Sequence, residues 1–174
     1  MKIEIVKTGY LEENCYILSK NSKCLIIDPG DDFENIEKIS SRYELVAILI
    51  THNHFDHVGA LKEFISKYNP IIYDRNNLKE KEYKIDCFKF FVIYTPGHTM
   101  DSISYYFKDD KALFVGDFIF KGSIGRTDLG GNKKEMINSI NKIKKYPNDI
   151  IIYPGHGDKT TLDYEIKNNV YFLQ

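Results

Sequence analysis

The segment Thr51–His57 concentrates residue types that bind metal ions. It reads Thr-His-Asn-His-Phe-Asp-His, so four potential ligands, His52, His54, Asp56 and His57, fall within six residues. In an extended chain residues two apart point the same way, so His52 and His54 can converge on one cation. Asp56 and His57 come after the chain bends into a helix, where they can hold a second cation. Neutral imidazole and carboxylate suit zinc, iron or manganese, and the lack of sulfur ligands here argues against a closed structural zinc site.

The two remaining histidines of the five lie in similar turns, Pro96-Gly97-His98 and Pro154-Gly155-His156. Each turn follows an apolar run, as Asp117 also does. Loops at strand ends are where a rigid sheet presents chemistry, so these side chains converge if the strands end on one edge. We predict one ion held by His52, His54 and His98, a second held by Asp56, His57 and His156, and Asp117 within reach of both.

Apolar patterns predict the elements that would position these residues. The buried run 46–50 leads into the motif, and apolar residues at three- and four-residue spacing predict a helix from the motif to residue 68. The charged stretch 74–84 is expected to be a loop or short helix, residues 109–110 a hairpin turn, and residues 121–131 a glycine-rich loop. Further strands are predicted at 2–8, 14–19, 23–28, 71–73, 88–94, 102–107, 112–115 and 150–153, and further helices at 33–42, 133–145 and 161–172.

Composition limits the class of protein. The 174 residues fit one domain, residues 1–174, with 43% apolar and 28% charged residues, and the strand and helix patterns indicate a layered mixed fold. A net charge of −1 gives no bulk attraction to nucleic acid or acidic membranes. The lysines of 133–145 are most simply the solvated face of a helix, and a nucleic-acid patch is the less favoured alternative.

The cellular setting follows from what the sequence lacks. It contains no apolar run long enough to cross a bilayer, and its N-terminus has no apolar signal core, so we expect a cytoplasmic protein without membrane contact. Its three cysteines, Cys15, Cys24 and Cys87, are widely spaced and have no metal-finger spacing. They are expected to be reduced thiols, with Cys15 and Cys24 buried.

The motif His52-x-His54-x-Asp56-His57, with the later His98, Asp117 and His156, resembles the metallo-β-lactamase fold hydrolases. The resemblance covers nearly the whole chain, from Asn14-Cys15-Tyr16 to the C-terminal helix. The stretch 122–128 and the tail 154–165 are similar to the short bacterial glyoxalase II-like (hydroxyacylglutathione hydrolase-like) subgroup. The resemblance implies an α+β fold, a four-layer αββα sandwich, with a binuclear site at one edge.

The resemblance also implies an activity. Two divalent metal ions, zinc before iron or manganese, would hold a hydroxide that attacks the carbonyl of a small-molecule thioester, with Asp56 and Asp117 as the catalytic carboxylates. Two alternatives stay open on the same fold, an iron-dependent persulfide dioxygenase and a lactonase or other ester hydrolase.

Three further residues near the predicted site have two readings each. Arg126 and Asp128 are expected to pair and brace the loop after Asp117, and direct contact with a substrate carboxylate is the alternative. Asp28 ends a strand and either supports a ligand or closes a turn.

Overall fold

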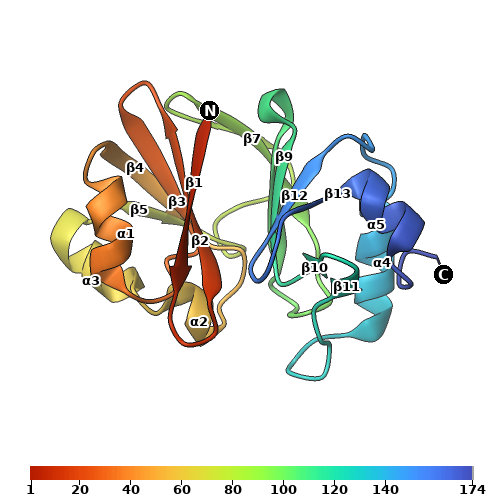
Figure 1. Cartoon of the computed structure of the whole chain (residues 1–174). Helices are drawn as coiled ribbons and strands as arrows, with labels where there is room; N and C mark the ends of the chain where they lie inside the picture. The colour runs from red at the N-terminus through yellow and green to blue at the C-terminus, as the bar shows by residue number, and fades with distance from the viewer. Residues whose placement is uncertain (174) are drawn as a thin grey trace.

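The computed structural model describes residues 1–173 and contains two β-sheets packed face to face (Figure 1). The helices α1 (Phe33–Ser40) and α3 (Leu61–Tyr68) cover the outer face of the first sheet, and α4 (Lys133–Ile143) and α5 (Leu162–Asn168) cover that of the second. The first sheet has the order β1 (Lys2–Thr8), β2 (Glu13–Lys20), β3 (Lys23–Ile27), β4 (Glu44–Leu49), β5 (Ile71–Tyr73). The second has the order β13 (Thr160–Thr161), β12 (Ile151–Pro154), β9 (Ala112–Gly116), β8 (Ile103–Phe107), β7 (Phe88–Tyr94), β6 (Glu82–Ile85). The predicted αββα sandwich is confirmed.

Three clusters of buried side chains separate the four layers. In β2 and β3, successive residues alternate between two clusters, because side chains of a strand point to opposite faces. Leu18 and Leu25 lie between the sheets with Phe90 and Phe114, whereas their neighbours Ile17 and Ile26 pack under α1 and α3. The third cluster packs α4 and α5 onto the second sheet, with Met136 and Leu162 against Leu113. Strands buried on both faces explain the continuous apolar runs in the sequence.

Strand directions bring four loops to one edge of the sandwich. β3 and β4 are parallel, and so are β9 and β12. β8 is antiparallel to both β7 and β9, so β7, β9 and β12 run the same way. The loops after β4, β7, β9 and β12 carry His52, His98, Asp117 and His156. The sheets are joined at this edge, where the Ile103 amide donates to the Thr51 carbonyl at 2.9 Å.

The helix predicted from the motif to residue 68 is wrong in one respect, because the chain breaks it into α2 (Phe55–Val58) and α3. The break follows from a close approach by the turn after β3. The Ala60 amide donates to the carbonyls of Pro29 and Gly30, at 3.1 and 3.0 Å. A Cβ on Gly59 would lie 2.1 Å from the Gly30 carbonyl oxygen, so only glycine allows this contact.

Other differences lie at element boundaries. The stretch predicted as a loop or short helix, 74–84, includes the start of β6, which gains its hydrogen bonds from β7. The glycine-rich loop 121–131 contains β11 (Ser123–Ile124), paired with β10 (Ile119–Phe120). The hairpin turn predicted at 109–110 is confirmed, since it connects the antiparallel strands β8 and β9, and it contains a short 3₁₀ helix, Lys108–Asp110. The last helix ends at Asn168 rather than residue 172, because Asn169 turns inward and its amide donates to the Ser123 carbonyl and the Glu165 carboxylate.

Cys15 and Cys24 are buried free thiols, as expected, and Cys87 is partly exposed. No helix within residues 1–173 has the length and apolar character needed to cross a bilayer.

One buried hydroxyl ties the second sheet to the start of the metal-binding motif. Tyr105 of β8 is fully buried, and its hydroxyl donates to the Ile50 carbonyl at 2.7 Å. We expect Tyr105→Phe to lower the free energy of unfolding by about 1 to 2 kcal/mol, because a buried hydrogen bond is lost without a change in packing. Urea unfolding monitored by circular dichroism measures the change. Tyr10→Phe is the matched control, since Tyr10 is 98% exposed and should be neutral; equal effects of the two substitutions would contradict this role.

Candidate metal centre

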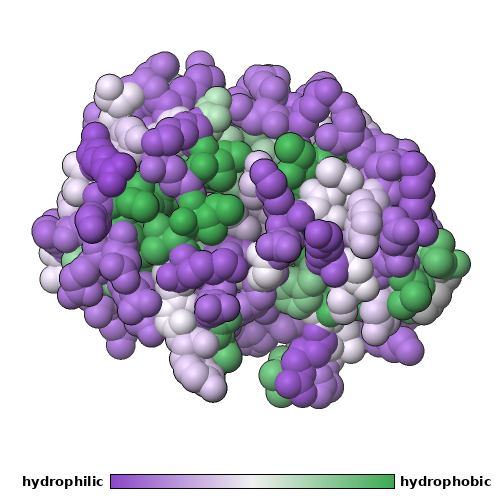
Figure 2. Space-filling view, in the orientation of Figure 1, coloured by the Kyte–Doolittle hydropathy of each residue, from purple (hydrophilic) through white to green (hydrophobic). Residues whose placement is uncertain are grey.

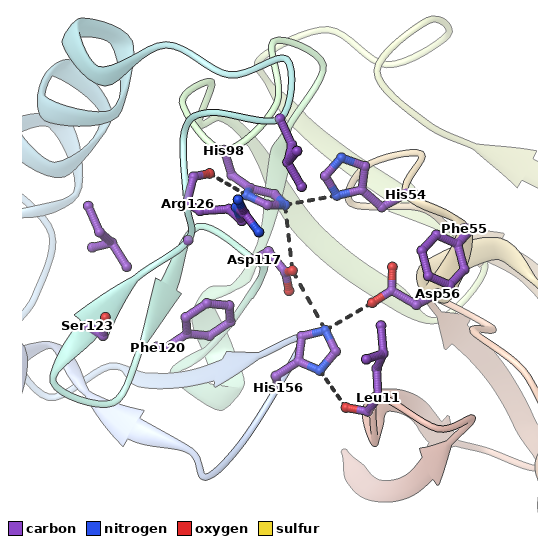
Figure 3. Close-up of a pocket in the computed structure, with 13 residues that line it drawn as sticks. Leu11, His54, Phe55, Asp56, His98, Asp117, Phe120, Ser123, Arg126 and His156 are labelled. Carbon is purple, nitrogen blue, oxygen red and sulfur yellow. Dashed lines mark hydrogen bonds and ion pairs between the residues drawn. The ribbon is translucent and has the colours of Figure 1, made fainter.

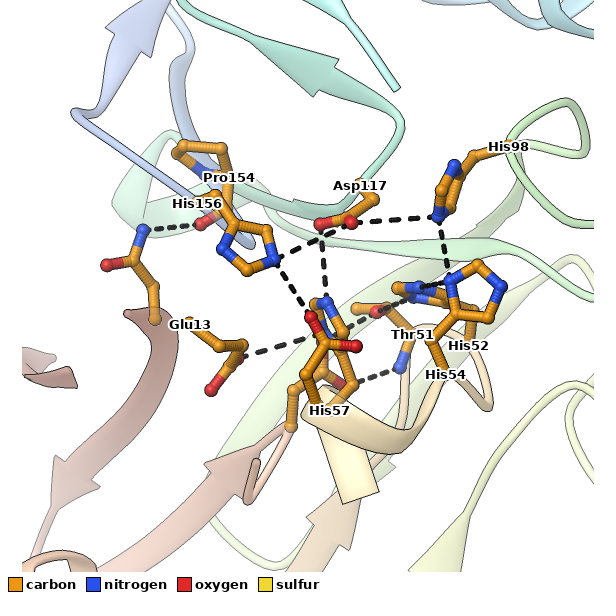
Figure 4. A network of polar contacts seen from close by, with 12 residues as sticks. Glu13, Thr51, His52, His54, His57, His98, Asp117, Pro154 and His156 are labelled. Carbon is orange, nitrogen blue, oxygen red and sulfur yellow. Dashed lines mark hydrogen bonds and ion pairs between the residues drawn. The ribbon is translucent and has the colours of Figure 1, made fainter. Parts of the chain in front are cut away.

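Seven predicted ligand residues, separated by up to 104 positions in sequence, lie together at the edge of the sandwich (Figure 3 and Figure 4). Potential ligand atoms of His52, His54 and His98 lie within 4.8 Å of one another, and so do those of Asp56, His57 and His156. Asp117 lies between the groups. Its carboxylate is 3.3 Å from Nε2 of His57, 3.6 Å from Nε2 of His98 and 3.7 Å from Nε2 of His156.

In the first group, three ring nitrogens face a common point. Nδ1 of His54 is 3.1 Å from Nε2 of His52 and 2.9 Å from Nε2 of His98. Ligand nitrogens about 2.0–2.1 Å from one tetrahedral zinc would be separated by roughly 3.3 Å, so these distances suit a shared cation. Burial and, for His52, the neighbouring His57 lower the pKa of both His52 and His54. These two rings are therefore neutral at pH 7, the form that binds metal.

In His98 and His156, a hydrogen bond on the side of the ring away from the centre sets which nitrogen faces inward. Nδ1 of His98 lies 2.7 Å from the Arg126 carbonyl, and Nδ1 of His156 lies 3.1 Å from the Leu11 carbonyl. A carbonyl accepts only, so Nδ1 of both rings donates to it, and Nε2 of both rings faces the centre. This is the arrangement by which second partners orient metal-ligating histidines.

Asp28 connects two of the other rings. Its carboxylate accepts hydrogen bonds from the Thr51 amide at 2.7 Å and from the Thr51 hydroxyl at 2.5 Å, and it lies 3.0 Å from Nδ1 of His57. The Thr51 hydroxyl proton is committed to Asp28, so its oxygen accepts from Nδ1 of His52 at 3.1 Å. Although Asp28 also lies within metal-binding reach of His52 and His57, its oxygens are occupied by these donors. Asp28 therefore orients His57 directly and His52 through Thr51.

Two buried polar atoms at the centre have no hydrogen-bond partner within residues 1–173, and they indicate whether the centre suits a cation. Among the described residues, Nε2 of His57 and Oδ1 of Asp117 are buried without hydrogen-bond partners, and they face each other at 3.3 Å. Unpartnered buried polar atoms are costly, and a cation coordinated by both would satisfy them. Burial lowers the pKa of His57, but the carboxylates of Asp117 and Asp28 outweigh it and raise the pKa well above its usual range. The position between these carboxylates thus favours positive charge, and the donor set fits divalent metal ions.

Two turns that carry later histidines are fixed by other elements. Against α4, the Ser139 hydroxyl donates to the Pro96 carbonyl at 2.7 Å. A Cβ on Gly97, where φ is 154°, would lie 2.6 Å from Cα of Met136, so α4 packs directly on the backbone before His98. Against β2, Asn14 and Tyr16 both donate to the Pro154 carbonyl, at 2.9 and 2.5 Å.

Sequence reasoning missed Glu13 as part of this region. Glu13 is fully buried, accepts from the Thr8 hydroxyl at 2.8 Å, and lies 3.7 Å from Nδ1 of His57. Burial raises the pKa of its carboxyl well above the usual range. In the sequence it stands in an acidic pair with Glu12, which looks like a solvent-facing turn, and no local signal distinguishes it.

The centre opens into a cavity of about 680 Å³ (Figure 3). His54, Asp56, His98, Asp117 and His156 line its floor. Arg126 lies in its wall and forms two hydrogen bonds with Asp128, at 2.7 and 2.6 Å, as the pairing prediction expected. The volume lies within the range of small-molecule sites. A small substrate therefore has access to the side of the centre where ligand atoms from both groups face solvent.

This chain is similar to known proteins in sequence and in fold. Residues 8–77 and 71–156 match the family model of the metallo-beta-lactamase superfamily, and these ranges contain all seven predicted ligand residues. The probable metallo-hydrolase YqgX of Bacillus subtilis (strain 168) is 33% identical, over 98% of this chain and 97% of that protein. The hydroxyacylglutathione hydrolase GloC of Haemophilus influenzae is 31% identical, over 98% of each chain.

Solved structures agree with the sequence comparisons. The crystal structure of the BLEG-1 B3 metallo-beta-lactamase matches with a TM-score of 0.94 at 32% identity, covering 99% of this chain and 100% of that chain. The di-iron-bound form of TTHA1623 matches with a TM-score of 0.88 at 28% identity, covering 97% and 99%. In sequence, in fold and in the clustering of histidine and aspartate at one sheet edge, this chain belongs to the metallo-beta-lactamase superfamily.

Proposed function

We propose that this chain hydrolyses a small thioester, in the manner of the hydroxyacylglutathione hydrolases among its relatives. The observation that carries the proposal is the pair of adjacent ligand groups that share Asp117 at the floor of an open cavity. The 31% identity to the Haemophilus influenzae hydroxyacylglutathione hydrolase over nearly the full length supports the reaction class. The hydroxyacylglutathione hydrolases among its relatives are 31–39% identical to this chain, and they support the class of bond that is cleaved rather than a particular acyl group.

Each ligand group would hold one divalent cation. His52, His54 and His98 would bind the first through nitrogens that already face one point. Asp56, His57 and His156 would bind the second, with Oδ2 of Asp56 3.2 Å from Nε2 of His156. Asp117 would contribute to both, since Oδ2 lies toward His98 and His156 and Oδ1 toward His57.

When bound, two divalent cations supply a water whose pKa is lowered to about 7 and a Lewis acid for the carbonyl oxygen. Asp56 and Asp117 offset half of the four positive charges of such a pair. The surroundings therefore stay positive, which favours the anionic transition state of carbonyl attack. Burial raises the pKa of Asp117, but the neighbouring histidines outweigh it and hold that pKa well below the usual range. Asp117 thus stays ionised at pH 7 and can accept a hydrogen bond from the attacking water.

The leaving group explains why a strong general acid is not required. A thiol has a pKa of about 8.5, so a thiolate leaves without prior protonation near neutral pH. Asp56 and Asp117 are the carboxylates that we propose act at the reacting centre, Asp117 by orienting the water and Asp56 by holding His156 and its cation in place.

We expect His54→Ala to abolish thioester hydrolysis and to remove about one metal ion per chain, because His54 contributes the central nitrogen of its group. Metal content by mass spectrometry and hydrolysis of S-lactoylglutathione measure the two effects, with circular dichroism as a check on folding. Asn53→Ala is the matched control, since Asn53 stands between two ligands but is exposed and bonds to Asp101. Wild-type metal content and activity in His54→Ala would contradict the assignment.

Metal loading separates hydrolysis from oxidation chemistry. We expect two zinc ions per chain to give full thioesterase activity after the chelated protein is reconstituted, and zinc is the metal that we propose. The di-iron-bound relative makes iron the alternative metal, so iron and manganese are reconstituted in parallel. One iron per chain with oxygen consumption on a persulfide, and no thioesterase activity with zinc, would favour the dioxygenase instead.

We expect Asp28→Asn to weaken metal affinity by about 10- to 100-fold, the range typical for loss of a partner that orients a metal-ligating histidine. The amide no longer matches all three donors, namely the Thr51 amide, the Thr51 hydroxyl and His57. Competition with a chromogenic chelator gives the affinity. Asp149→Asn, which changes an exposed aspartate paired with Lys111, should leave it unchanged. If Asp28→Asn retains wild-type affinity, Asp28 only closes the turn.

A further inference from the structure

We propose, on the basis of the thioesterase function above, that the substrate's acyl group is an apolar chain without a carboxylate. The inference is based on the side chains in the cavity walls rather than on the candidate metal centre. The occupant is a small molecule, because the cavity is continuous with the floor of ligand residues where the carbonyl must react.

The walls above the ligand residues are apolar on both sides. Leu11 and Phe55 stand on one side, and Phe120, Ile124 and Leu129 contribute to the other. In Figure 3 the ligand side chains lie between Phe55 and Leu11 on one side and Phe120 on the other. Figure 2 shows a hollow in the surface at this edge, between two projections of the molecule, and each projection has green, hydrophobic surface near the hollow.

Several of these apolar side chains are open to solvent. Phe55 is 76% exposed, Leu129 54% and Leu11 47%. Three large apolar side chains facing one hollow form a patch of the kind that marks ligand-binding surfaces. An apolar chain placed between them would remove this surface from water, which is the main source of affinity for such a group.

Charge in the hollow disfavours an acyl group that carries a carboxylate. Apart from histidines, Arg126 is the one cationic side chain among the described residues that line this cavity, and Asp128 already neutralises it. A second hollow of about 410 Å³ adjoins the first across Leu11, Phe55 and Asp56. It contains Asp31 and no lysine or arginine among its described lining residues. A carboxylate at the end of an acyl chain that extends away from the ligand residues would thus meet apolar walls or Asp31.

A series of acyl thioesters on one neutral carrier, N-acetylcysteamine, tests the proposal with the metal-loaded protein. The acetyl, butyryl and hexanoyl thioesters vary chain length, and the succinyl thioester matches butyryl in carbon number but adds a carboxylate. We expect kcat/KM to rise by about fourfold per methylene, since each buried methylene contributes about 0.8 kcal/mol. Butyryl should exceed succinyl by at least tenfold. Rates that stay flat with chain length, or a preference for succinyl, would overturn the proposal.

Two variants of the walls locate the effect. Phe55→Ser and Leu129→Ser should each flatten the dependence of kcat/KM on chain length, lowering the hexanoyl value more than the acetyl value. Val170→Ser is the matched control, since Val170 is 61% exposed and lines neither hollow. An unchanged length dependence in both wall variants would show that the acyl chain binds elsewhere and would overturn the assignment.

Binding without turnover separates this inference from the proposed reaction. Unreactive S-alkyl thioethers of N-acetylcysteamine, titrated calorimetrically into the metal-free protein, should bind more tightly as the alkyl chain lengthens, with a negative heat-capacity change. If this holds while every thioester, S-lactoylglutathione included, resists hydrolysis, the proposed function fails and the apolar cavity stands. If S-lactoylglutathione is hydrolysed but affinity ignores chain length, the reaction stands and the acyl inference fails.

Discussion

The arrangement of the centre depends on the hydrogen bonds that the buried carboxylate of Asp28 makes with Thr51 and His57. This carboxylate accepts two hydrogen bonds from Thr51 and contacts Nδ1 of His57, and through the Thr51 hydroxyl it also sets the ring of His52. One buried side chain at the end of β3 therefore determines which nitrogens of the His52 and His57 rings face the centre. The position requires φ of 50° at Asp28, a left-handed conformation that aspartate tolerates better than most residues.

Each of the other groups is held by an element from a different part of the chain. α4 packs against the turn before His98, β2 donates to the turn before His156, and the turn after β3 interrupts the helix that follows the motif. A centre that draws on both sheets is sensitive to how the sheets are stacked. Two hydrogen bonds connect the sheets at the edge where the ligands meet. The Tyr105 hydroxyl donates to the Ile50 carbonyl, and the Ile103 amide donates to the Thr51 carbonyl.

The ligand residues and the cavity walls have different chemical character, and a hydrolase needs both. The centre combines five imidazoles with two carboxylates, so it suits cations and negative charge that develops during the reaction. The walls are apolar, and Arg126 in the wall is already paired with Asp128. Reaction type would therefore follow from the centre, and preference among substrates from the walls.

The sequence by itself determined the residue types, the strands and the strand ends at which those residues stand. Apolar runs and the spacing of His52, His54, Asp56 and His57 are local properties, so a layered mixed fold and the grouping of the later histidines could be predicted. The four-layer αββα arrangement came from the resemblance to the metallo-β-lactamase fold hydrolases. Only the tertiary structure decided which ring nitrogen faces inward, because that depends on carbonyls such as those of Arg126 and Leu11, far away in sequence. The same holds for Glu13, which looks exposed locally and is buried by the strands around it, and for the helix broken by Gly30. These features arise from contacts between distant segments, which periodicity and spacing do not encode.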